Sequence, residues 1–329
     1  MKKVAITGGG GYVGSALVPH LAGRGWDVKV IDLFLYGEPV LDGVRCSRIR
    51  GDIRDEGLLR REFRGMDAVI HLACVSNDPS FELDPILGRS INYDAFPGLL
   101  RACRDEGVAR LIYASSSSVY GVREEPEVRE DTPCTPLTDY SRFKLLCESL
   151  LRESDFRGEW VIVRPSTVCG HATRMRFDLV VNILTINALL RQAITVFGGT
   201  QLRPNINIED MVEAYQVLLE APGGKIQGRT FNVGYENYSV SRLAELVKSA
   251  VGDPKVTISV SPSNDLRSYH VNSNLIRETL GFAPRHSLEE AVQSIVRAHR
   301  EGRYQDPLSN PLYHNIRRMQ ESAAGAGRR

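Results

Sequence analysis

Short apolar stretches alternate with longer helical stretches along the first half of the chain. Runs such as KVAIT and DVKVID are rich in valine and isoleucine, and they lack the strict apolar–polar alternation of half-exposed strands. We expect strands over 3–8, 27–33, within 48–55, and over 66–73, 108–117 and 159–168. Helices are expected over 14–25, 58–65, 87–107 (kinked at Pro97) and 141–154. Buried strands separated by helices predict a parallel sheet covered on both faces.

After about residue 171 the alternation becomes less regular. Helices are expected over 177–190 and 241–252, strands over 194–199, 229–235 and 255–262, and a strand end running into a helix over 203–222. No internal repeat and no linker-like run separates these segments from the first half. They therefore predict a smaller lobe built on the same sheet.

The composition excludes several classes of protein. The chain has 329 residues, 42% of them apolar, with 41 Lys and Arg against 40 Asp and Glu and a net charge of +1. This balance gives no electrostatic case for binding nucleic acid or an anionic membrane. No apolar stretch approaches the length of a membrane span. Six scattered cysteines and no recognisable signal peptide favour reduced thiols in a cytoplasmic protein, and no metal site is expected.

A glycine-rich loop joins the first expected strand to the first expected helix. In ITGGGGYVGSAL, Gly8, Gly11 and Gly14 permit a tight turn, close approach of the backbone to a diphosphate, and close packing of helix on strand. The helix N-terminus would face the phosphates. Asp32 ends the second strand about twenty residues on, where a carboxylate can bind both ribose hydroxyls. Because that charge would repel a 2′-phosphate, the pattern predicts NAD and not NADP.

The fold class that follows is α/β: a Rossmann-type doubly wound parallel sheet with a smaller C-terminal α/β substrate-binding lobe. We place the NAD-binding domain at 1–170, the lobe, interleaved with the same sheet, at 171–310, and a tail at 311–329.

Tyr140 and Lys144 lie on one face of an expected helix, four residues apart. Such a pair is common by chance, but here the preceding strand ends in a run of four serines. Together these suggest hydride transfer at an alcohol carbon. The Lys144 ammonium and a charged nicotinamide ring would lower the pKa of Tyr140 from its usual value of about 10. Tyr140 could then take the alcohol proton while a serine hydroxyl holds the substrate oxygen.

The motifs TGGGGYVG, GDIRD, HLA, YASSSSVYG, YSRFK and RPSTVCG follow the order and spacing of the extended short-chain dehydrogenase/reductases. From residue 3 to about residue 300, the chain resembles the nucleotide-sugar enzymes of the UDP-galactose 4-epimerase type. The resemblance implies an NAD-dependent enzyme acting on a nucleotide-diphosphate sugar. It also implies a homodimer formed through a four-helix bundle of helices near 86–105 and 140–154.

The resemblance also assigns roles to individual residues. Asp52 and Ile53 would lie at the adenine, and Pro165 near the nicotinamide. The implied catalytic residues are Ser116, Tyr140 and Lys144. The implied cofactor-binding residues are Gly8, Gly11, Tyr12, Val13, Gly14, Asp32, Asp52, Ile53, Leu72, Ala73, Asn92, Ser115, Tyr140, Lys144 and Pro165.

For the sugar nucleotide, the resemblance implies Phe197 beside the base and Arg203 as a clamp on the diphosphate. Asn182 is similar to a phosphate-contacting asparagine. Surface salt bridges are the alternative reading of Arg203 and Arg267. The implied substrate-binding residues are Ser76, Asn77, Ser116, Ser117, Thr167, Asn182, Phe197, Arg203, Asp265 and Arg267.

The serine run bears on the type of reaction. By this resemblance, Ser116 occupies the position of the family's catalytic hydroxyl. In sugar-nucleotide 4,6-dehydratases, the corresponding stretch of sequence resembles Thr-Asp-Glu. Here Ser117 and Ser118 stand in place of both acids. A serine hydroxyl cannot serve as a general acid or base near pH 7, so dehydration is not expected.

Several departures leave the overall reaction open. Thr167 begins TVCG where many 4-epimerases have Asn-x-x-Gly, and CVSNDPSFELDP lacks their usual basic residue. Arg174 and Arg176 lie in a loop expected to vary, and RMRFDLVVN also resembles C4-dehydrogenases, including heptose enzymes. The leading hypothesis is a nucleotide-sugar 4-epimerase. The alternatives are a C4-dehydrogenase or 4-keto-reductase, and a non-catalytic dinucleotide-binding module.

Overall fold

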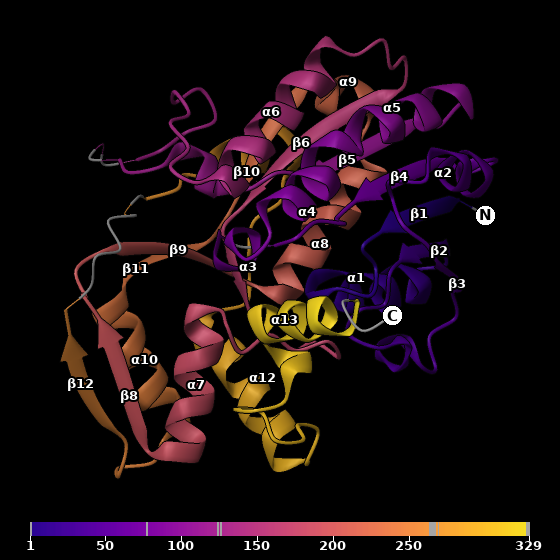
Figure 1. Ribbon diagram of the computed structural model, residues 1–329. Helices are drawn as coiled ribbons and strands as arrows, with labels where there is room; N and C mark the ends of the chain where they lie inside the picture. Colours follow the sequence, from indigo (N-terminus) through magenta and orange to yellow (C-terminus); the bar gives the residue numbers. More distant parts are fainter. Residues whose placement is uncertain are drawn as a thin grey trace.

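The centre of the protein is a parallel sheet of seven strands. The computed structural model describes residues 2–76, 78–123, 125, 127–262, 268 and 270–326. The strand order is β10-β6-β5-β4-β1-β2-β3, and every pair is parallel (Figure 1). The strands are β1 (Lys3–Thr7), β2 (Asp27–Asp32), β3 (Ser47–Arg50), β4 (Ala68–His71), β5 (Arg110–Ala114), β6 (Glu159–Pro165) and β10 (Arg229–Val233). The Rossmann-type α/β class predicted from the sequence is confirmed.

Helices cover both faces of this sheet because alternate residues of each strand point to opposite sides. In β1, Val4 and Ile6 pack with Leu17 of α1, while Ala5 packs with Leu59 of α2. The first face is covered by α1 (Tyr12–Gly23), α8 (Ile208–Glu220), α9 (Gly223–Ile226) and α11 (Asn274–Leu280). The second is covered by α2 (Glu56–Phe63), α5 (Phe96–Asp105) and α6 (Asp139–Glu153).

The helix expected over 87–107 is interrupted before Pro97. Its parts are α4 (Pro85–Arg89), the π-helical turn η2 (Ser90–Asp94) and α5, and Pro97 lies in the first turn of α5. Proline is tolerated there because the N–H that it lacks would have no partner within the helix. The π-turn directs Asn92 toward the loop after β4, where its amide bonds the N–H and carbonyl of Val75 at 2.8 and 3.0 Å.

The smaller lobe has its own core. It contains α7 (Val180–Arg191), α10 (Val240–Val251) and α12 (Leu288–Arg300), packed on the two-stranded sheet of β8 (Ala193–Phe197) and β12 (Thr257–Ser261). A three-stranded sheet of β7 (Thr167–Cys169), β9 (Leu202–Asn207) and β11 (Glu236–Ser239) connects it to the main body. Short helical turns are η1 (Glu38–Leu41), α3 (Asp78–Glu82) and η3 (Ser117–Tyr120).

The segment assigned to a tail folds back onto the first half of the chain. It forms η4 (Pro311–Tyr313) and α13 (Asn315–Ala326), drawn in yellow beside the N-terminal elements (Figure 1). The Tyr36 hydroxyl donates to Asn315 Oδ1 at 3.0 Å, and Arg318 Nε donates to the Leu35 carbonyl at 2.5 Å. Residues 311–326 are therefore part of the folded body. Within the described ranges, no helix combines the length and apolar character needed to cross a membrane.

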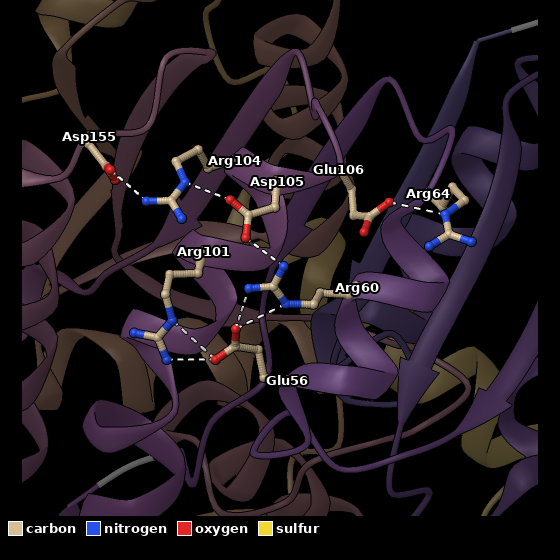
Figure 2. Close-up of polar contacts among 8 residues, drawn as sticks. All are labelled: Glu56, Arg60, Arg64, Arg101, Arg104, Asp105, Glu106 and Asp155. Atoms are coloured by element: carbon tan, nitrogen blue, oxygen red, sulfur yellow. Dashed lines mark hydrogen bonds and ion pairs between the residues drawn. The ribbon is translucent and has the colours of Figure 1, made fainter.

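Ion pairs join the polar sides of α2 and α5 (Figure 2). Glu56 accepts from Arg60 at 2.7 Å and from Arg101 at 2.6 Å, and the Arg101 guanidinium is the main cause of the lowered pKa of Glu56. The network continues through Arg60–Asp105, Asp105–Arg104 and Arg104–Asp155, with Arg64–Glu106 beside it. The polar side of α5 is thus held to α2 while its apolar side is buried in the core.

Candidate functional site

A large cavity opens at the carboxyl ends of β1, β2, β4, β5 and β6. This is the edge where open α/β sheets bind their ligands. Its volume is about 1320 Å³, above the roughly 300–1,000 Å³ that is usual for one small-molecule ligand. Its far end reaches α7, Phe197 of β8 and Arg203 of β9 in the smaller lobe. The cavity therefore has room for two ligands side by side.

The glycine loop forms one wall. Gly8 has φ +77°, and a Cβ at this position would lie 2.5 Å from the backbone nitrogen of Ala73. A Cβ on Gly14 would lie 2.5 Å from Gly9 Cα, so α1 can rest on the loop only if residue 14 is glycine. Gly11, Tyr12 and Val13 also line the cavity, and α1 begins at Tyr12. The loop thus presents the free N–H groups of a helix N-terminus to the cavity.

Asp32, the last residue of β2, is hydrogen-bonded to the glycine loop. Its carboxylate accepts hydrogen bonds from the Gly10 N–H at 2.9 Å and the Phe34 N–H at 2.6 Å. Burial raises the pKa of Asp32, against the two backbone hydrogen bonds and the charge of Arg174, which lower it. The carboxylate oxygens retain lone pairs for further donors on the cavity side. Asp52 and Ile53 line the same end, with Asp52 paired to Arg54 at 2.5 Å.

Tyr140, Lys144 and Ser116 meet at the middle of the cavity. Lys144 is buried, and its Nζ donates to the Ala114 carbonyl at 2.7 Å and lies 5.9 Å from the centre of the Tyr140 ring. Ser116 Oγ lies 2.8 Å from Ser118 Oγ, and both serines line the cavity with Tyr140. The helix-face prediction for Tyr140 and Lys144 therefore puts both side chains beside the serine run.

The expected lowering of the Tyr140 pKa is not produced by the protein's own groups. Burial raises this pKa well above its usual value, and Cys74 and Asp78 add to the effect. Arg176 and Ser116 lower the pKa and so oppose this rise. The prediction included the charge of a bound nicotinamide ring, so it stays a prediction; in the protein alone, the loss of hydration outweighs the nearby positive charges.

The rest of the serine run divides between the cavity and the core. Ser117 and Ser118 line the cavity together with Ser116. Ser115 Oγ instead donates to Glu148 Oε1 at 2.6 Å, within a buried group of polar side chains. Its backbone N–H donates to the Val163 carbonyl, which ties β5 to β6. Ser115 also lines the cavity, but its hydroxyl proton and its N–H are both engaged, so its backbone carbonyl is the group left to meet a cofactor.

Most of the other predicted residues line the cavity, and two asparagines do not. Those that line it are Leu72, Ala73, Ser76, Pro165, Thr167, Phe197 and Arg203. Asn92 is committed to Val75. Asn182 is fully buried: its Oδ1 accepts from the Gly170 N–H, and its Nδ2 donates to Tyr12 Oη and the Arg176 carbonyl. Asn77, Asp265 and Arg267 lie outside the described residues.

Sequence reasoning missed the contribution of the C-terminal segment. Asn315, Met319 and Gln320 line the cavity, and Asn315 is only 2% exposed. The Asn315 Nδ2 donates to Ser76 Oγ at 2.8 Å, and its backbone N–H donates to Asp178 at 3.3 Å. The one available signal was Asn310 before Pro311, a helix-start pattern. It indicates a turn but not what the turn contacts.

Comparison with known proteins decides the family. The model described as "NAD dependent epimerase/dehydratase family" matches residues 4–234. The chain belongs to this family. UDP-glucose 4-epimerase of Streptomyces lividans is 30% identical over 302 residues, covering 86% of this chain and 91% of that protein.

Solved structures of similar proteins agree with the family. UDP-glucose 4-epimerase from Thermotoga maritima, solved with UDP-glucose, has a TM-score of 0.82 at 25% identity and covers 91% of this chain and 99% of that chain. The protein MoeE5, solved with UDP-glucuronic acid and NAD, has a TM-score of 0.81 at 27% identity with the same coverage. The resemblance to extended short-chain dehydrogenase/reductases is confirmed.

NAD is the cofactor of this epimerase/dehydratase family member, and the residues present fit it. The glycines leave no space for a Cβ in the turn that would receive the dinucleotide's phosphates. Asp32 has acceptor capacity for the ribose. The buried Nε of Arg174 has no hydrogen-bond partner in the structure. Such an orphaned donor on the wall of the cavity suits an anionic ligand.

Proposed function

We propose that the protein is a nucleotide-sugar 4-epimerase. The observation that carries this proposal is the meeting of Tyr140, Ser116 and Lys144 between two ends of one cavity. One end carries the glycine loop and Asp32. The other carries Phe197 and Arg203, which suit a base and a diphosphate. A sugar joined to that diphosphate would place its ring at Tyr140.

NAD, when bound, supplies reversible hydride transfer at carbon 4 of the sugar. Tyr140 Oη accepts the proton of the sugar hydroxyl and later returns it, acting as base and then as acid. Ser116 donates to the sugar oxygen and holds it at Tyr140, which spares the entropy of orienting the two. Lys144, fixed by the Ala114 carbonyl, lies beside the tyrosine ring, and its charge together with that of the nicotinamide ring would favour the phenolate against the effect of burial.

The groups around Ser116 argue against dehydration. Ser117 and Ser118 supply hydroxyls where an acid–base pair is needed to remove water. Asp78 acts on Tyr140 electrostatically and lines the cavity, but its Oδ1 accepts a hydrogen bond from the Thr138 hydroxyl. A carboxylate held in this way serves better to position the start of α6 than to exchange protons with a sugar.

The proposal includes a homodimer formed through the helices that the sequence pointed to. Ile86 of α4 is 84% exposed, and Leu146 of α6 is 38% exposed. Isolated exposed apolar residues are common. Two large ones on neighbouring helices provide apolar area for a self-complementary contact between two protomers. The polar side of α5 is not available for this purpose, because its arginines pair with α2 and Asp155 (Figure 2).

The proposed function is tested with a panel of nucleotide sugars, with products identified by NMR and NADH followed by absorbance. We expect inversion at carbon 4 with no lasting NADH signal. Tyr140→Phe should lower kcat by about 10²–10⁴-fold. The control Tyr235→Phe, at a 45% exposed residue outside the cavity lining, should not change it. Accumulation of NADH with a keto product would identify a C4-dehydrogenase, and turnover unaffected by Tyr140→Phe would overturn the assignment of the base.

A further inference from the structure

Arg174 is a buried cation that forms no ion pair with the described residues, although the charge of Asp178 acts on it from a greater distance. Its side chain is 3% exposed, it lines the cavity, and no carboxylate among the described residues lies within ion-pair distance of it. Its Nε is fully buried and has no hydrogen-bond partner. Burial lowers the pKa of Arg174 to about 10, so the guanidinium is still charged at neutral pH. A buried charge in this state is unfavourable unless a ligand compensates it.

The contacts of Arg174 place it at the cofactor end of the cavity. Its backbone N–H donates to Ser15 Oγ of α1 at 3.1 Å. Its guanidinium carbon lies 3.6 Å from the centre of the Tyr36 ring, just after β2. Its Nη2 donates to Asn315 Oδ1. The charge of Arg174 also acts on Asp32. The glycine-loop helix thus holds the backbone of Arg174, while Tyr36 and Asn315 orient its guanidinium.

The other cations that line the cavity at this end and at its centre already have partners. Arg54 pairs with Asp52, Arg176 pairs with Asp178 at 2.9 Å, and Lys144 is bonded to the Ala114 carbonyl. The glycine loop contains no basic residue, and none occurs between Leu72 and Gly88 after β4. Without Arg174, the two negative charges of a dinucleotide's diphosphate would meet only backbone N–H groups there.

We propose that Arg174 binds the diphosphate of NAD, reaching the cofactor from the smaller lobe across the start of α1. The planar guanidinium, backed by the Tyr36 ring and held by Asn315, brings a positive charge and N–H donors to the phosphate oxygens. The site depends on NAD as cofactor and not on which sugar reaction follows. It adds to the glycine loop a cation that comes from outside the nucleotide-binding half.

The test measures binding by titration calorimetry with no sugar present. Arg174→Met keeps the length of the side chain and removes the charge. We expect the affinities for NAD and for ADP to fall 10- to 100-fold, while that for adenosine stays within 2-fold. Arg174→Lys should recover part of the loss, because it restores charge without the planar donor set. Arg24→Met, at the exposed end of the same α1 helix, is the control and should bind NAD normally.

Folding is monitored separately by thermal unfolding of the cofactor-free proteins. Removing a buried charge that has no ion pair should leave the Tm of Arg174→Met unchanged or raised. A lowered Tm with equal losses for adenosine and NAD would show a structural role and overturn the proposal. Unchanged NAD binding with weakened UDP binding would also overturn it, since Arg174 would then serve the diphosphate of the sugar nucleotide.

Discussion

Glu148 and Arg164 form a buried ion pair beside Ser115, the first residue of the serine run. Glu148 is 1% exposed and Arg164 is 4% exposed. Arg164 Nε and Nη2 donate to the two oxygens of Glu148 at 2.9 and 2.7 Å. Ser115 and Arg152 donate to the same carboxylate at 2.6 and 3.1 Å. Glu148→Gln would remove the negative charge from this group while keeping nearly the same shape.

The expected cost follows from the geometry of this pair. Removing one partner of a buried ion pair costs about 3–5 kcal/mol, because the other charge stays buried without compensation. Glutamine keeps one acceptor oxygen for Arg164 or Ser115, so we expect the lower part of the range, about 3 kcal/mol. The Tyr120 hydroxyl, 2.8 Å from Arg164 Nη1, cannot replace a carboxylate.

The assay is urea unfolding followed by circular dichroism, with stability taken from the midpoint and slope. Glu148→Met combined with Arg164→Met should recover most of the loss, because both charges are then absent. Glu301→Gln, in an exposed pair with Arg303, should not move the midpoint. A loss below about 1 kcal/mol for Glu148→Gln would refute the view that this pair is a compensated buried charge.

Two further predictions concern the glycine loop and the core. Gly14→Ala should abolish NAD binding measured by calorimetry, because the added Cβ would lie 2.5 Å from the Gly9 backbone. The control is Gly23→Ala in the same helix, whose Cβ would meet nothing within 4 Å and which should bind NAD normally. Equal binding by both variants would contradict the packing argument. Burial lowers the pKa of His71 from 6.5 to about 3, so the unfolded chain binds more protons below pH 6.5 and stability falls as the pH falls. Between pH 7 and pH 5 this should cost about 2 kcal/mol, which His71→Leu should remove from the pH profile of urea unfolding; an unchanged profile would show that His71 is not the cause.

The parts of this protein that the sequence predicts well are those encoded by local patterns. Buried strands need apolar residues on both faces, so the order of strands and helices follows from the apolar runs. The loop of Gly8 and Gly14 is predictable because only glycine fits both the turn and the packing. Pro97 likewise marks a break in its helix, although the π-turn before it has no pattern of its own.

The parts that could not be predicted depend on contacts between distant segments. Asn182 matches a phosphate-contacting position in its motif, yet all of its bonds go to Tyr12, Gly170 and Arg176. Nothing in a local pattern says whether an amide will meet backbone or ligand. Arg174 and Asn315 are 141 residues apart and still orient one another. Such pairs are fixed by how the lobes pack, which a pattern of apolar and polar residues does not encode.

The return of the C-terminal segment has a consequence for how the protein is made. The wall that begins at Gly8 is completed by Asn315, so the cavity is assembled from both ends of the described chain. A ribosome adding about 5–20 residues per second needs roughly 15–60 seconds to travel between these two positions. Mass-action stabilisation by NAD reaches only a chain whose site is complete. During translation, the parallel sheet therefore has only the packing of its own core to stabilise it, without the contribution of NAD binding.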